Sequence, residues 1–145
     1  MTQSSAAPAM TGVHHFSPTV CDVEASAAWY ERVFGMTRLP VTFAHHDDEQ
    51  SGYAVLLADA RSGVVIGLHH HADNDGERFA ENRTGLDHIG FGVSTRAELD
   101  AWAAWLDGLG VEHTGVRDIA EPMPFSTLVF RDPDNIQLEL IHTPS

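Results

Sequence analysis

The chain has 145 residues, 43% of them hydrophobic and 20% charged, which is the composition of one ordinary globular domain. Eight Lys and Arg stand against 21 Asp and Glu, so the formal net charge is −13. This acidic balance argues against nucleic acid as a partner, because that needs a basic surface to contact phosphates. No apolar run in the sequence approaches the roughly 20 residues of a membrane-spanning helix.

The compartment is predicted from two further features. Cys21 is the only cysteine, so no disulfide can form within the chain, which is typical of a reducing environment. Residues 1–10 lack the basic start and the apolar middle of a secretory signal. We therefore expect a cytoplasmic protein in which residues 1–11 form a disordered tail.

The first half of the chain predicts a strand, a helix and three more strands. Residues 12–20 predict a short strand, with Pro18 at a bulge or an edge. Residues 21–36 predict a helix that begins at Asp22 and ends at Gly35. The three strand-like runs that follow are residues 41–46, 53–59 and 63–70.

The second half repeats this order after a polar linker, residues 72–85. Residues 86–93 predict a strand, and residues 94–110 predict an amphipathic helix with Ser94 or Thr95 as its N-cap. The three strand-like runs that complete the chain are residues 111–118, 125–132 and 136–142.

Two anchors support an internal duplication. His15 and His88 open the first strand of each half, 73 residues apart, and residues 63–70 align with 135–142 at an offset of 72. The agreement predicts an α+β fold of two tandem βαβββ modules. A unit of about 60 residues buries too little core alone, so modules 12–71 and 86–142 should pack together or pair across a dimer.

Three side chains with metal-binding chemistry stand out on the predicted strands. Because side chains alternate along a strand, Glu139 faces away from the apolar residues around it and shares a face with Gln137. A carboxylate on such a strand is costly to bury unless it is paired or bound to metal. His15, His88 and Glu139 are therefore the candidate ligands of one divalent metal ion, and two His with one carboxylate suit Fe, Mn, Zn, Ni or Co alike.

Three segments, residues 14–36, 86–93 and 130–141, together resemble the vicinal oxygen chelate superfamily, and the resemblance extends over residues 12–142 as a single domain. This superfamily includes glyoxalase I, methylmalonyl-CoA epimerase, extradiol dioxygenases and the bleomycin and fosfomycin resistance proteins. The resemblance implies a curved, mostly antiparallel glyoxalase-like sheet around a central cavity. It also implies a homodimer, metal ligation by His15, His88 and Glu139, and a catalytic role for Glu139 as a proton shuttle.

One position departs from the pattern of that superfamily. Its lyases and epimerases carry a fourth ligand in the last strand of the first module, and by internal alignment the position is Gly67 here, which cannot coordinate. Either the metal keeps three protein ligands, which we favour, or His69 takes the missing place from the same strand face. The further candidate contacts to substrate or metal are His69, Tyr53 and Phe125.

The leading hypothesis of function is a metal-dependent enzyme that acts on a small oxygenated substrate through bidentate chelation. Both a lyase or isomerase of the glyoxalase type and a dioxygenase fit this description. The alternative is a metal-free protein of the bleomycin-resistance type that binds an antibiotic-like molecule between two subunits. The acidic charge suits a cationic ligand, but such a binder does not require the His, His and Glu set. Whether the site forms within one chain or across a dimer stays open.

Overall fold

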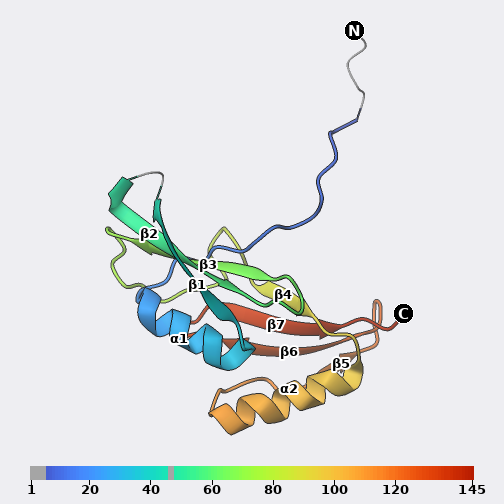
Figure 1. The fold of residues 1–145 in the computed structure, drawn as a ribbon. Helices are drawn as coiled ribbons and strands as arrows, with labels where there is room; N and C mark the ends of the chain where they lie inside the picture. The colour runs from blue at the N-terminus through green and yellow to red at the C-terminus, as the bar shows by residue number, and fades with distance from the viewer. Residues whose placement is uncertain (1–5, 46–47) are drawn as a thin grey trace.

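A computed structural model describes residues 6–45 and 48–145 (Figure 1). Residues 1–5 of the predicted disordered tail lie outside the described residues, and residues 6–11 are exposed and belong to no helix or strand. Within the described ranges no helix is long and apolar enough to cross a membrane. The elements in chain order are α1 (Val23–Phe34), β1 (Thr37–His45), β2 (Asp48–Ala58), β3 (Val65–His71), β4 (Ile89–Gly92), α2 (Arg96–Leu109), β5 (Arg117–Ile119), β6 (Phe125–Arg131) and β7 (Gln137–His142).

The strands form two open sheets. One has the order β1-β2-β3, all antiparallel, and the other has the order β4-β7-β6-β5, in which β4 runs parallel to β7 and the other pairs are antiparallel. The predicted first strand lies along β3: Phe16 N donates to Val65 O, and Gly67 N donates to Phe16 O. Pro18 has no N–H to donate, so this segment makes two isolated parallel bridges instead of a continuous strand.

Each module therefore places its first strand parallel to its last. Phe16 pairs with Ile66 in the first module, and Ile89 pairs with Leu138 in the second. The remaining strands of each module add in antiparallel order beyond the last strand. The predicted α+β fold of two βαβββ modules is confirmed, with a local register that matches the internal alignment of the sequence.

Both helices have a capping side chain at the start and a glycine at the end. The Asp22 side chain accepts a hydrogen bond from Ala25 N at 3.0 Å, and Gly35 ends α1 in the left-handed conformation with φ 66°. The Thr95 hydroxyl caps α2 by accepting a hydrogen bond from Glu98 N, and the Glu98 carboxylate accepts one from Thr95 N. The two bonds form a capping box. Of the two predicted caps, Thr95 is the one used.

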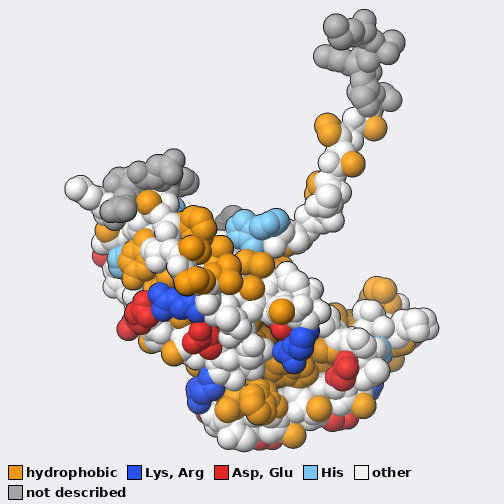
Figure 2. Space-filling model, in the orientation of Figure 1, with side chains coloured by type: hydrophobic (Ala, Val, Ile, Leu, Met, Phe, Trp, Pro, Cys, Tyr) orange, Lys and Arg blue, Asp and Glu red, His pale blue; other side chains and the backbone are white. Residues whose placement is uncertain are grey.

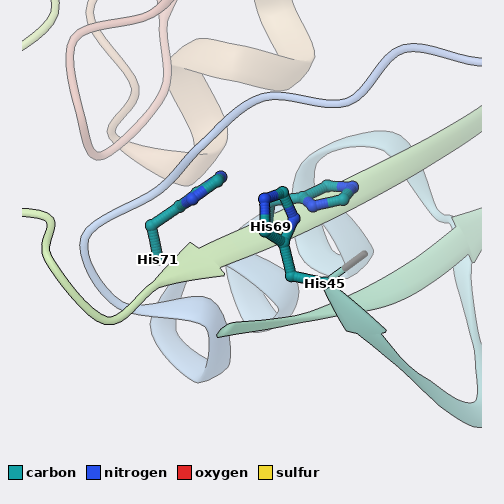
Figure 3. Close-up of side chains that lie close together, drawn as sticks. All are labelled: His45, His69 and His71. Carbon is teal, nitrogen blue, oxygen red and sulfur yellow. The ribbon is translucent and has the colours of Figure 1, made fainter. Parts of the chain in front are cut away.

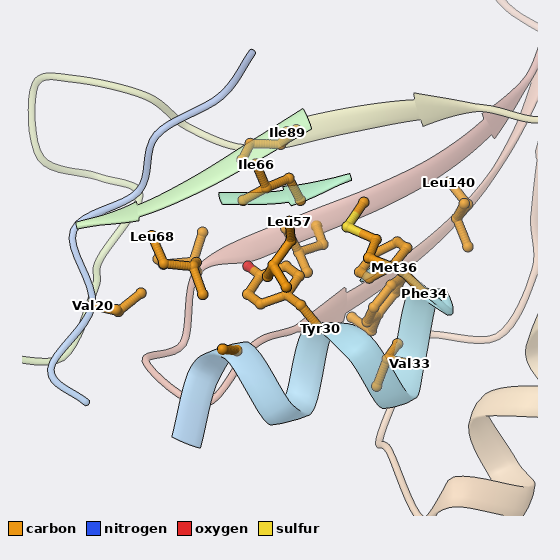
Figure 4. Close-up of a cluster of buried hydrophobic side chains, with 14 of the residues drawn as sticks. Val20, Tyr30, Val33, Phe34, Met36, Leu57, Ile66, Leu68, Ile89 and Leu140 are labelled. Carbon is orange, nitrogen blue, oxygen red and sulfur yellow. The ribbon is translucent and has the colours of Figure 1, made fainter. Parts of the chain in front are cut away.

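The two helices cover the same side of the sheets, where the modules share one hydrophobic core (Figures 1 and 4). α1 packs against β2 and β3, and α2 packs against β6 and β7. Phe34 at the end of α1 reaches the second module, since its ring centroid lies 5.0 Å from that of Phe91 and 5.8 Å from those of Trp102 and Phe130. The opposite face of each sheet carries His69 in the first module and Glu139 in the second, both partly buried.

The surface around this fold is uneven. Figure 2 shows hydrophobic side chains gathered over β1, where Val41 and Phe43 are about half exposed at 46% and 49%. Acidic and basic side chains lie scattered over the rest of that view. β1 is the outer strand of its sheet, so these apolar groups stand at an edge.

Candidate metal centre

His88 and Glu139 come together on the face of the second sheet that points away from α2. Gly90 lies opposite Glu139 in the parallel β4–β7 pair, and His88 comes two residues before Gly90, so the three share a face. His88 Nε2 lies 3.7 Å from Glu139 Oε2, and the two side chains are 40% and 17% exposed. Gly90 has no side chain to fill the space beside Glu139, and a Cβ there would meet nothing within 4 Å.

A chain of hydrogen bonds orients His88. Asp87 Oδ1 lies 2.7 Å from His88 Nδ1, and Gln137 Nε2 donates to the same Asp87 oxygen at 3.0 Å. A carboxylate only accepts hydrogen bonds, so Nδ1 donates to Asp87, and in the neutral ring Nε2 then keeps its lone pair toward Glu139. A carboxylate behind a histidine is the arrangement that fixes the ring of a metal-bound histidine.

The spacing of these two atoms fits a divalent metal. Bonds of about 2.1 Å at angles of roughly 90–110° place two ligand atoms about 3.0–3.5 Å apart. The 3.7 Å between His88 Nε2 and Glu139 Oε2 needs a closure of only a few tenths of an ångström. In the tautomer set by Asp87 both atoms are acceptors, so a cation between them satisfies both.

His15 does not complete this group within one chain. Among the residues that the structure describes, the only group of three potential ligands whose atoms all lie within 4.8 Å of one another does not contain His15. Its side chain is exposed, and its Nδ1 lies 2.8 Å from Nδ1 of His14. The segment that follows does approach the site, since Ser17 and Thr19 line a cavity of about 210 Å³ together with His88.

Neighbouring side chains crowd Gly67, the position at which the fourth ligand of the lyases is missing. Gly67 follows the Phe16–Ile66 pair as Glu139 follows the Ile89–Leu138 pair, so the two positions are equivalent. A Cβ at position 67 would lie 2.8 Å from Ser17 Oγ and 3.8 Å from His69 Nε2. The His69 ring thus lies next to Gly67.

His69 also belongs to a cluster that the sequence analysis missed. Its ring meets those of His45 and His71, and the ligand atoms of the three lie within 4.8 Å of one another (Figure 3). His69 and His71 share a face of β3 because they are two residues apart, a signal that the sequence contains. His45 ends β1 and belongs to the strand predicted at residues 41–46, of which His46 lies outside the described residues. The pairing that brings His45 beside β3 does not follow from the sequence pattern.

The other two candidate contacts lie elsewhere. Tyr53 pairs with His70 across β2 and β3, on the helix-facing side, and packs against the core. It is therefore not on the face that carries His69. Phe125 begins β6 on the same face as Val129, the residue paired with Glu139, but four residues or roughly 13 Å along the strand.

The predicted linker is fastened to the second module near this site. Glu81 forms an ion pair with Arg131 through two hydrogen bonds of 2.7 and 2.9 Å. Arg131 also donates to Gln137 Oε1, and Gln137 Nε2 donates to Asp87. The segment also bonds to the turn before β7, where Asn135 Nδ2 donates to Phe79 O at 2.9 Å. The linker is thus part of the support of His88.

Replacing Glu81 with Gln should lower stability in a pH-dependent way. Hydrogen bonds from Arg131 lower the pKa of Glu81 to about 2, whereas an unfolded Glu titrates near 4.3. A lowered folded pKa stabilises the protein above the unfolded pKa, and this stabilisation is lost as the pH falls toward about 2. Urea unfolding of both proteins from pH 7 to pH 3 should show the advantage of the wild type shrinking with acid.

Glu77→Gln serves as the control in the same segment, because its ion pair with Arg83 is 66% exposed on both sides. Equal losses for the two variants at every pH would contradict the role given to Glu81.

Comparison with known proteins supports the fold and the family. Residues 12–140 match the Glyoxalase/Bleomycin resistance protein/Dioxygenase superfamily. The chain is 30% identical over 92 residues to the putative ring-cleaving dioxygenase MhqA of Bacillus subtilis (strain 168). That match covers 63% of this chain and 28% of MhqA, so the chain spans well under a third of that relative's length.

Two solved structures illustrate the likeness. A glyoxylase/bleomycin resistance protein/dioxygenase domain from Frankia sp. EAN1pec is 29% identical, with a TM-score of 0.80 over 94% of this chain and 100% of that one. A mutant fosfomycin resistance protein, FosX, from Listeria monocytogenes, complexed with Mn(II) and 1S,2S-dihydroxypropylphosphonic acid, is 20% identical with a TM-score of 0.65 over 94% and 93%. The second likeness concerns the fold alone. The resemblance found in the sequence is confirmed, and the chain belongs to the Glyoxalase/Bleomycin resistance protein/Dioxygenase superfamily.

Proposed function

We propose that the protein is a divalent-metal-dependent enzyme that acts on a small substrate with two adjacent oxygen atoms, and that His88, Glu139 and His15 hold the metal. The observation that carries the proposal is the Asp87–His88–Glu139 arrangement, with Nδ1 held from behind and Nε2 turned toward a carboxylate 3.7 Å away. A non-catalytic binder needs no such arrangement. A bound metal would supply Lewis acidity toward the two substrate oxygens.

We propose further that His15 reaches the site from a second copy of the chain. Within one chain His88 and Glu139 are together and His15 does not join them. His15 is exposed at the start of the first module, where a partner subunit can meet it. A homodimer would then contain two equivalent sites, each built from both subunits.

The residues around Glu139 suit a small ligand. Gly90 and Gly92 leave open space on the same face, since a Cβ at either position would meet nothing within 4 Å. Val129 and Ile141 lie next to Glu139 on neighbouring positions of β6 and β7 and supply an apolar wall. We infer that Glu139, which is only 17% exposed, accepts a proton from a substrate carbon or hydroxyl held in that space.

Within this class we favour ring-cleaving oxygenase chemistry over lyase chemistry. A site with three protein ligands leaves more open positions than the four-ligand sites of the lyases, which suits a chelating diol and a second reactant. The relationship to MhqA, a protein named as a putative ring-cleaving dioxygenase, favours the same reading, although the chain covers 28% of that protein.

The proposal is tested on untagged protein by elemental analysis and by oxygen uptake with catechol as the probe. Stoichiometric iron or manganese together with catechol-dependent oxygen uptake is the expected result. Metal without oxygen uptake, but with turnover of the methylglyoxal–glutathione hemithioacetal, would assign the chain to the lyases instead. Protein that holds no stoichiometric metal after incubation with Fe(II), Mn(II) or Zn(II) would favour the metal-free binder.

A further inference from the structure

A second group of potential ligands lies on the open face of the first sheet. β3 sends Ile66 and Leu68 into the core, so Gly67, His69 and His71 take the other face. Phe43 of β1 pairs with Ala54, and Ala54 pairs with His69. His45 follows Phe43 by two residues, so strand alternation places its ring on the same face. The three rings converge from two strands in Figure 3.

The contacts between the rings are close. The ring centroids of His45 and His71 lie 4.1 Å apart at an interplanar angle of 69°, and those of His45 and His69 lie 5.6 Å apart at 84°. One nitrogen from each ring lies within 4.8 Å of the others. All three side chains are partly buried, so they are held among neighbouring atoms and not spread in solvent.

We propose that His45, His69 and His71 form a metal site separate from the one built on His88 and Glu139. Three imidazoles are neutral ligands of intermediate softness, a set that suits Zn²⁺, Ni²⁺ or Cu²⁺ better than Mg²⁺ or Ca²⁺. Three protein nitrogens leave a fourth position for water or for an oxygen of a ligand. The nitrogens lie within 4.8 Å of one another and must close to about 3.4 Å when a metal binds.

The surroundings favour a cation. His71 lines a cavity of about 360 Å³ together with three carboxylates, those of Asp73, Asp75 and Glu77. The turn after β3 brings these acids back beside the strand, since Asn74 N donates to His71 O at 3.1 Å. Their negative field compensates the two positive charges that a divalent ion brings to three neutral rings, and it draws cations toward the cluster.

The strand itself supplies a matched control. His70 lies between His69 and His71 but points to the opposite face, where its ring centroid is 5.2 Å from that of Tyr53. Removing His70 therefore lowers the histidine content of β3 by the same amount without removing a ligand of the proposed site.

The experiment titrates untagged, metal-free, full-length protein with Zn²⁺ by calorimetry and with Co²⁺ by visible absorption. A Glu139→Gln background disables the other site, so that failure of the proposed function and failure of this site are distinguished. In that background one equivalent of Zn²⁺ should still bind. Adding His69→Gln and His71→Gln should weaken this binding at least about 100-fold, because loss of even an indirect ligand support costs 10–100-fold.

His70→Gln in the same background should leave the affinity unchanged within about twofold. Unfolding curves establish that each variant is folded, and His45→Gln, on the edge strand, replaces the double variant if that protein does not fold. The proposal is overturned if the Glu139→Gln protein binds no Zn²⁺, or if binding persists unchanged in the His69 and His71 double variant or in His45→Gln.

Discussion

Glu139→Gln is expected to lower the affinity of the protein for its catalytic metal at least about 100-fold and to reduce turnover with it. Gln has the same shape as Glu, but its amide is neutral and a far weaker ligand for a divalent ion. Outer partners of metal ligands are worth 10–100-fold each, so a direct ligand should be worth at least as much. Metal affinity is measured by competition with a chelating dye, which does not depend on knowing the substrate.

Glu112→Gln is the matched control, because Glu112 is an exposed carboxylate in the segment after α2. It removes the same charge and should leave both metal content and turnover as they are. Unchanged metal affinity in Glu139→Gln would sink the assignment of this carboxylate as a ligand.

A pair of alanine variants, His15→Ala and Glu139→Ala, can also assign His15 to a chain. In a homodimer that shares its sites, His15→Ala protein has no intact site, and neither has Glu139→Ala protein. Mixing the two after unfolding and refolding should restore one complete site in each mixed dimer, with His15 from one subunit and Glu139 from the other. If every site forms within one chain, no mixed dimer contains a complete site and activity stays absent.

Asp132→Ala is expected to lower the free energy of unfolding by about 3 kcal/mol at pH 7. Asp132 is buried, and its carboxylate accepts hydrogen bonds of 2.9 Å from the Tyr30 hydroxyl and from the backbone N–H groups of Asp134 and Ile136. These bonds tie α1 of the first module to the β6–β7 turn of the second. Alanine leaves two backbone donors and a buried phenol without their acceptor.

The cost of this variant should depend on pH. Burial raises the pKa of Asp132 to about 6, partly offset by the hydrogen bonds that it accepts. A raised folded pKa means that the contribution to stability is complete below the unfolded value of about 3.9 and is lost as the pH rises through about 6. The deficit of Asp132→Ala should therefore be larger at pH 4.5 than at pH 7.5, by on the order of 2 kcal/mol.

Tyr30→Phe should show the opposite trend. The hydroxyl of Tyr30 bonds more strongly to an ionised carboxylate than to a protonated one, so its loss should cost about 1.5–3 kcal/mol at pH 7.5 and less at pH 4.5. Asp100→Ala, which breaks an exposed ion pair with Arg96, should cost less than about 1 kcal/mol at either pH. Parallel pH trends for the two buried variants, followed by urea unfolding, would contradict this account of the pair.

Much of the fold was predictable because its signals are local. The start and end of α1 follow from one capping side chain and one glycine, and the two modules follow from an offset that sequence comparison within the chain detects. The strand predicted for residues 111–118 is the main difference. Only Arg117–Ile119 forms a strand, because Gly115 takes φ 74° and the Thr114 hydroxyl accepts from Val129 N, so the chain meets β6 irregularly.

The residues of the candidate site were predictable where strand alternation alone determines the face on which a side chain lies. Glu139 and His88 meet because each faces away from apolar neighbours on paired strands, as the alternation required. The role of Asp87 was missed because a carboxylate next to a histidine in sequence normally points to the other face. His45 was missed because its place beside His69 depends on the pairing of Phe43 with Ala54 and of Ala54 with His69, and such pairing between strands leaves no pattern in the sequence.

Gly67 and its neighbour Ser17 bear on how this chain could gain a fourth metal ligand. A carboxylate at position 67 would match the four-ligand members of the superfamily, but the first carbon of any side chain there would lie 2.8 Å from Ser17 Oγ and 3.2 Å from Leu56 Cδ2. A ligand at position 67 therefore requires that the Ser17 hydroxyl rotate away or be lost and that Leu56 shift by a few tenths of an ångström. The first module thus has less room at this position than the second module has at Glu139, and a change from a three-ligand to a four-ligand site involves Ser17 and Leu56 as well as position 67.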